Sequence, residues 1–238
     1  GVIADIFGYR LTFIAGGAML LAGGALVAVG AQEKFIRPSA DSLQKSGTMR
    51  ILFTLPGFVS LLAIFFLVNF SIHIAIPILP LFIEEIGNLK TGLASTTGLM
   101  FAVTGATASI SAAAIGYLSD RRGHRQVLAV NLFVTGILWV AHALARSISQ
   151  LLVIRIIFGF AVGGNMPTMN ALVGKITPQE SYGKAYGLAA SMTSLGMTLG
   201  PLAGGFMASW LGLRWTFVMA SLLLILAVIP LILRLKTS

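Results

Sequence analysis

The segment GYLSDRRGHR, from Gly116 to Arg125, gathers one aspartate, three arginines and one histidine into ten residues of a mostly apolar sequence. Asp120 provides a carboxylate acceptor, and three arginines provide guanidinium donors, so the segment can form charge-assisted hydrogen bonds. Contacts of this kind between helix ends can hold one conformation and release another. The glycines Gly116 and Gly123 would allow the tight turn that the segment needs. We therefore predict a conformational switch that includes Asp120, Arg121 and Arg125. The alternative is that the arginines only orient the chain in a membrane.

The composition indicates which elements position this segment. The 238 residues are 57% hydrophobic and 10% charged, with a mean hydropathy of +0.94, which is typical of an all-α polytopic membrane protein and excludes a large soluble domain. The net charge of +9 would suggest nucleic acid binding in a soluble protein. Here the basic residues fall in short loops between apolar runs, so they indicate membrane orientation and no nucleic acid partner.

Seven apolar runs are long enough to cross a bilayer as helices. They are residues 12–30, 52–80, 94–118, 127–145, 149–174, 184–208 and 214–233. Eleven lysines and arginines lie in the loops on one side of these spans and four lie on the other side. The side with the excess of basic residues, which includes the C-terminus, should face the cytoplasm. We expect the protein to lie in the inner or plasma membrane.

The sequence also contains an internal repeat. The segment GVIADIFGYRLTF, at residues 1–13, aligns without gaps to GFMASWLGLRWTF at residues 205–217. Six positions coincide: Gly1/Gly205, Ala4/Ala208, Gly8/Gly212, Arg10/Arg214, Thr12/Thr216 and Phe13/Phe217. Repeats of this kind are common in transporters. We therefore expect three regions: the end of an N-terminal half (1–31), a cytoplasmic linker (32–50) and a C-terminal six-span bundle (51–238).

Three motifs resemble the major facilitator superfamily. GYLSDRRGHRQVL, residues 116–128, resembles the cytoplasmic signature loop of that family, with Ser119 and His124 as departures. Arg155 and Gly159 fit its Arg-x-x-x-Gly element, and residues 187–205 fit the Gly-x8-Gly-x3-Gly-Pro-x2-Gly-Gly pattern of its antiporter branch.

The resemblance implies a secondary active transporter that exports small, amphiphilic, drug-like molecules by alternating access, in exchange for protons. The implied partners are the substrate, protons, the lipid bilayer and the N-terminal half of the same chain, without a cofactor. The alternatives are a carrier of a polar solute, such as a sugar or an organic anion, and a receptor that binds a ligand on this fold without transporting it. The sequence has no phosphate-binding glycine loop, no metal-ligand cluster and no activated nucleophile, so we expect no enzyme.

Three glycines spaced by four residues, Gly196, Gly200 and Gly204, share one helix face and predict close approach of a second helix. Pro201 removes a backbone hydrogen bond and can bend the same span. This face is either a moving contact of the switch or a static packing surface.

Polar residues inside the predicted spans are the other candidates. Arg155 is costly in a membrane, so it either contacts substrate, joins an ion-coupling network or has a structural role. Asn69 and His73 are four residues apart and could belong to the same network, or only hydrogen-bond between helices. A substrate cavity lined by Phe70, Asn165, Met166 and Asn170 would suit an amphiphilic ligand.

Overall fold

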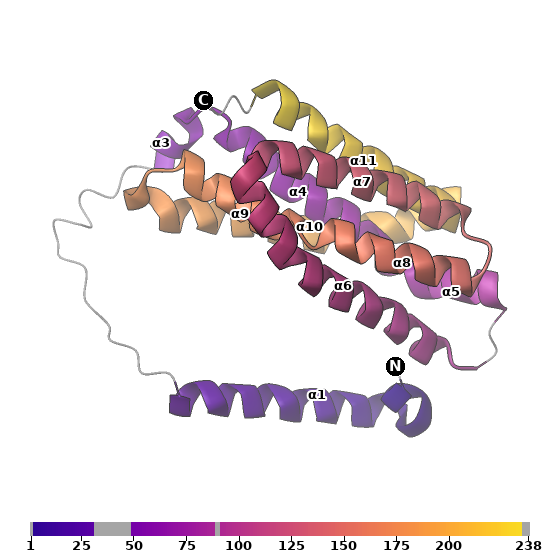
Figure 1. Ribbon diagram of the computed structural model, residues 1–238. Coiled ribbons are helices and arrows are strands. Elements are labelled where there is room, and N and C mark those ends of the chain that lie inside the picture. Colours follow the sequence, from indigo (N-terminus) through magenta and orange to yellow (C-terminus); the bar gives the residue numbers. More distant parts are fainter. Residues whose placement is uncertain (1, 31–48, 89–90, 235–238) are drawn as a thin grey trace.

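The computed structural model describes residues 2–30, 49–88 and 91–234, and its regular structure is helical throughout these ranges (Figure 1). This confirms the predicted all-α class. The helices are α1 (Val2–Gly30), α3 (Met49–Thr54), α4 (Phe58–Ala75), α5 (Ile78–Gly87), α6 (Leu93–Arg122), α7 (His124–Leu144), α8 (Ile148–Val162), α9 (Asn165–Ile176), α10 (Tyr182–Leu211) and α11 (Leu213–Arg234), with a 3-10 turn η1 (Gln179–Ser181). Except for Met49 and Arg50, the predicted linker lies outside the described residues.

Within the described ranges, five segments are long and apolar enough to cross a membrane. They are Arg10–Gly30, Phe58–Gly87, Leu93–Arg122, His124–Leu144 and Ile148–Ile176. The two remaining predicted spans are helices that fall short of this criterion. The 30 residues of α10 include many glycines, serines and threonines, which lower its mean hydropathy, and the apolar part of α11, Leu213–Ile229, is shorter.

The predicted span 52–80 is wrong as a single helix, because the chain breaks it twice. Helix α3 ends before Pro56 and Gly57, and Gly57 has a positive φ of 82° that side chains with a Cβ rarely adopt. Helix α4 ends at Ala75 because Pro77 has no N–H to donate to the carbonyl of His73. The rest of the crossing is made by α5.

The predicted span 149–174 likewise consists of two helices, α8 and α9. They meet at Gly163 and Gly164, which keep right-handed helical dihedrals, so the chain changes helix without a sharp turn. Pro167 cannot donate to the carbonyl of Gly163, and this missing bond accounts for the break. Pro201 does not break α10 in this way, since the helix continues through that residue.

Helix α4 lies at the centre of the bundle, against α10 and α11; α7 packs on α11, and α8 packs on α6 (Figure 1). The core contains the rings of Trp139, Phe82 and Phe217, which come from α7, α5 and α11. The Phe217 ring centroid is 5.1 Å from that of Phe82 and 5.7 Å from that of Trp139. Helix α1 runs beside the bundle, and residues 10–30 are not buried by it (Figure 1).

The two aligned repeat segments share a backbone turn. Gly8 has φ 81° and ψ 166°, and Gly212 has φ 91° and ψ 162°. In each segment the threonine four residues later donates its hydroxyl to the glycine carbonyl, Thr12 to Gly8 and Thr216 to Gly212, both at 3.2 Å. The sequence alignment therefore corresponds to one local structure that occurs twice.

Candidate functional site

The predicted glycine face of α10 packs directly on α4. Gly196, Gly200 and Gly204 are all buried, as their spacing predicts. A Cβ built on Gly196 would lie 2.7 Å from the backbone nitrogen of Phe70, and one built on Gly200 would lie 2.7 Å from the Cβ of His73. The two helix backbones are therefore too close for any side chain at these positions.

Asn69 and His73 lie at the same α4–α10 contact. The Asn69 amide donates to the carbonyl of Phe65 at 2.8 Å and approaches the hydroxyl of Thr193 on α10 at 3.5 Å. The His73 Nδ1 lies 2.8 Å from the carbonyl oxygen of Asn69. The structure thus joins these two predicted residues in one polar contact, and it does not place Arg155 among their hydrogen-bond partners.

Arg155 is buried in the middle of α8, with 4% of its surface exposed. Its guanidinium carbon lies 5.6 Å, 5.8 Å and 6.0 Å from the ring centroids of Phe158, Trp139 and Phe101. Among the described residues it has no carboxylate within ion-pair distance, and its Nε has no hydrogen-bond acceptor. The contacts found for its guanidinium in the described part of the chain are therefore with aromatic faces.

Two more polar groups without partners adjoin this arginine. The Trp139 indole Nε1 and the His142 Nε2 are buried and lack hydrogen-bond partners, while the His142 Nδ1 lies 2.6 Å from the carbonyl oxygen of Leu138. The His142 ring packs on Trp139 and Phe158, the rings that also contact Arg155. This cluster could not be predicted from the sequence, because it joins two residues of α7 to two residues of α8.

The α6–α7 loop is a one-residue turn at Gly123, whose φ of 94° accounts for the glycine. The prediction that Gly116 also forms the turn is wrong, because α6 continues to Arg122 and encloses it. The Asp120 carboxylate is exposed and lies 3.9 Å from Nε2 of His124. Arg121 lies over the ring of Tyr117 at 4.4 Å. The loop thus presents an exposed carboxylate at the end of the bundle.

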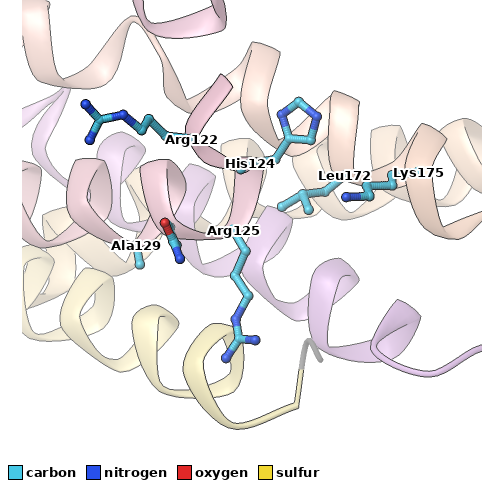
Figure 2. Close-up of a pocket in the computed structure, with 8 residues that line it drawn as sticks. Arg122, His124, Arg125, Ala129, Leu172 and Lys175 are labelled. Carbon is cyan, nitrogen blue, oxygen red and sulfur yellow. The ribbon is translucent and has the colours of Figure 1, made fainter. Parts of the chain in front are cut away.

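A basic pocket of about 390 Å³ adjoins this loop (Figure 2). Arg122, His124, Arg125 and Lys175 line it with Leu172. Figure 2 shows Arg125 extending toward α11 while His124 points to the opposite side, and the Arg125 Nε donates to the carbonyl of Leu231 at 2.8 Å. This bond links the predicted switch to the last turns of α11.

The four predicted substrate-contact residues are not brought together. Asn165 is buried, and neither polar atom of its side chain has a partner. Met166 is 41% exposed, and the ring of Phe70 stacks on that of Phe66 with centroids 5.3 Å apart. The Asn170 carbonyl accepts a bond from the hydroxyl of Tyr186. None of the four predicted residues lines the cavity beside Arg155 or the pocket beside Lys175.

Arg214 was counted only as a basic loop residue in the sequence, and the structure gives it a further role. Its Nη1 donates to the carbonyls of Ala143 and Ala145 at 2.7 Å and 3.1 Å, where α7 ends. Its Nε lies 3.7 Å from the carboxylate of Glu85. The match between Arg10 and Arg214 in the repeat was a usable signal for a structural role.

Comparison with known proteins finds relatives among membrane transporters. The chain is 31% identical over 229 residues to the uncharacterized MFS-type transporter YuxJ of Bacillus subtilis, covering 94% of the chain and 57% of that protein. It is 31% identical over 226 residues to the multi-drug resistance efflux pump PmrA of Streptococcus pneumoniae, covering 93% of the chain and 56% of the pump. It is 34% identical over 162 residues to the multidrug resistance protein MdtG of Escherichia coli, covering 68% of the chain and 40% of that protein.

The chain therefore spans little more than half the length of YuxJ and PmrA, and its match to MdtG covers less than half of that protein. Residues 61–238 match the sequence pattern of the Major Facilitator Superfamily. That match covers most of the sequence and includes every helix from α6 to α11. The chain is a multi-pass membrane protein that belongs to the Major Facilitator Superfamily of transporters.

Proposed function

We propose that this chain is part of a twelve-span secondary transporter that exports small amphiphilic molecules by alternating access. Residues 1–31 would be the end of its N-terminal half, residues 32–50 a cytoplasmic linker and residues 51–238 its C-terminal six-span bundle. The observation that carries the proposal is the similarity to PmrA over 93% of the chain. The printed names of PmrA and MdtG describe drug efflux, and the antiporter glycine pattern agrees with that direction.

The α4–α10 contact supports a moving part in this proposal. At Gly196, Gly200 and Gly204 two backbones meet with no side chains between them, so the contact contains few interlocking groups that would oppose a small shift. Transporters of this kind alternate by rigid-body motion of one bundle against another. In this proposal α10 changes its contacts on α4 as the substrate pathway opens and closes.

The α6–α7 loop is the proposed switch, at the cytoplasmic end of the molecule. The exposed Asp120 carboxylate is the group that would pair with donors on the N-terminal half in one conformation. Arg121 and Arg125 are held within this half, by Tyr117 and Leu231, so they would set the shape of the loop. Breaking the Asp120 contact would favour the inward-open state.

Protons are the proposed coupling ion. All five acidic residues within the described ranges are exposed, and none lies in the middle of a span. A titrating carboxylate for proton exchange would therefore belong to the N-terminal half. The candidates for a coupling role within this chain are Glu84, Glu85 and His73.

The test uses cells that express the full-length protein carrying this sequence. The cells are loaded with a fluorescent amphiphilic dye, and loss of dye is followed with and without a protonophore. Efflux above the empty-vector level that collapses with the protonophore is the expected result. Efflux equal to that of the empty vector would contradict the proposal and favour a polar-solute carrier or a receptor.

A further inference from the structure

A cavity of about 170 Å³ lies beside Arg155, within the bundle of α4, α6, α7 and α8. We call it the Arg155 cavity; its lining includes Phe101, Thr104, Trp139, Arg155 and Phe158, and the aliphatic side chains of Ile72, Ala75, Ile76 and Val162 complete it. Arg155 is the one ionisable residue of this lining. The cavity therefore combines aromatic faces with a single fixed positive charge.

The charge of Arg155 has no negative partner in the described part of the chain. Each of the five acidic residues there is exposed, and the two ion pairs found join other residues, Asp120 with His124 and Glu85 with Arg214. The hydroxyl of Thr104, 3.5 Å from the backbone oxygen of Arg155, does not accept from the guanidinium. An arginine that is 4% exposed is thus left without an acceptor for its Nε.

Aromatic contacts offset only part of the cost of burying this charge. Rings at 5.6 Å to 6.0 Å stabilise a cation through their faces, but they do not accept the directed hydrogen bonds of a guanidinium. A buried cation without an anion is strongly unfavourable, whereas a carboxylate would satisfy the charge and two hydrogen bonds together. The site is complete only when an anionic group enters it.

The size of the cavity limits what that group can be. An engineered cavity of about 150 Å³ is known to hold benzene, so about 170 Å³ accommodates an aromatic ring or a ring with a small substituent. Such a ring can pack on the faces of Phe101 and Trp139. The Arg155 guanidinium then supplies the hydrogen-bond donors for an anionic substituent.

From this combination we propose that the Arg155 cavity binds the anionic end of an aromatic carboxylate, with the guanidinium of Arg155 on the carboxylate and the ring against Phe101 and Trp139. The inference rests on the proposed transport function, because it names the chemical class of the substrate: amphiphiles whose aromatic end carries a negative charge.

The test measures equilibrium binding to the full-length protein in lipid nanodiscs, with no ion gradient. Radiolabelled benzoate is the probe, and unlabelled benzoate, benzamide and benzylamine compete with it. These three compounds share a ring system and differ in charge. We expect benzoate to bind at least about tenfold more tightly than the neutral amide, and the amine to compete least.

Variants locate the effect. Arg155→Gln is expected to weaken benzoate binding at least about tenfold and to leave the affinity for benzamide nearly unchanged, while Arg155→Lys retains part of the preference for the anion. The matched control is Arg146→Gln, which removes an exposed arginine near the start of α8 and should have no effect. If Arg155→Gln does not fold, the three-compound comparison on the parent protein still decides the question.

Three results would overturn the inference. The first is equal competition by all three compounds. The second is benzoate binding that survives Arg155→Gln unchanged. The third is loss of transport of every substrate in Arg155→Gln with binding intact, which would mean that a carboxylate of the N-terminal half pairs with Arg155. Binding without any efflux would refute the transport proposal and leave the anion site standing.

Discussion

Gly200 and His73 meet with no space for a side chain between their helices, since a Cβ on Gly200 would lie 2.7 Å from the Cβ of His73. The nearest atoms at Gly200 also include the Phe70 carbonyl oxygen at 2.9 Å. The opposing group is backbone or a Cβ, which cannot move aside as the end of a long side chain would. The α4–α10 contact at this level therefore depends on glycine.

This contact predicts that Gly200→Ala lowers the free energy of unfolding of the full-length protein by about 1–3 kcal/mol, because the added methyl group forces the helices apart. Thermal unfolding in detergent measures the change. Gly205→Ala is the matched control on the same helix, since a Cβ at Gly205 would meet no atom within 4 Å. Equal unfolding temperatures for the two variants would contradict the close-approach argument.

Asp120→Asn should reduce transport at least about tenfold without reducing the amount of protein in the membrane, because the amide cannot form the charge-assisted bonds of the proposed switch. Efflux rate and surface expression are measured together. Glu180→Gln removes another exposed acid, next to α10, and should leave the rate unchanged. Transport by Asp120→Asn at the parent rate would remove Asp120 from the switch.

Asp5 and Ser95 connect α1 to the start of α6, and this contact should depend on pH. The backbone amide of Ser95 donates to the Asp5 carboxylate at 2.7 Å, and hydrogen bonds from Ser95 hold the pKa of Asp5 below its usual 3.8. A lowered pKa means that the contact is fully present above pH 3.8 and is lost as the pH falls through the lower, folded-state value.

Spin labels at the exposed residues Ile6 and Leu99 report on that contact. The distance distribution should be narrow and unchanged from neutral pH down to mildly acidic pH, and it should broaden in strong acid. Asp5→Asn should broaden it at every pH, because the amide is a weaker acceptor. A distribution that broadens near the ordinary pKa of histidine would point to another group.

Arg214→Lys should destabilise the protein by about 1 kcal/mol, because a lysine cannot donate to both helix-end carbonyls with the fixed geometry of a guanidinium. Thermal unfolding again gives the measurement, and Arg146→Lys, an exposed residue in the loop before α8, serves as the control. Destabilisation by both variants to the same extent would mean that the bonds to Ala143 and Ala145 contribute nothing specific.

The features that the sequence predicted best depend on a local pattern. The glycine spacing of α10 forecast its buried face, because residues four apart share a side of a helix whatever lies opposite. The helix breaks at Pro77 and Pro167 were missed, because hydropathy over a long window does not register one absent N–H.

Contacts between segments that are distant in the chain could not be predicted from the sequence. Arg155 was marked as unusual by its position in an apolar run, but the rings around it lie on three helices, and no spacing in the sequence brings them together. The four predicted substrate-cavity residues stay a prediction. Asn165 and Met166 are neighbours in the chain, yet one is buried and the other is largely exposed, since successive residues of a helix face different ways.

The turn shared by Gly8 and Gly212 has a consequence for ancestry. Two segments 204 residues apart keep the same dihedral angles and the same threonine hydrogen bond although fewer than half of their aligned residues agree. A duplicated gene leaves this trace when both copies inherit a turn that tolerates no Cβ and then diverge around it. The two glycines are best regarded as one inherited position, so a substitution at either should meet the same backbone restriction.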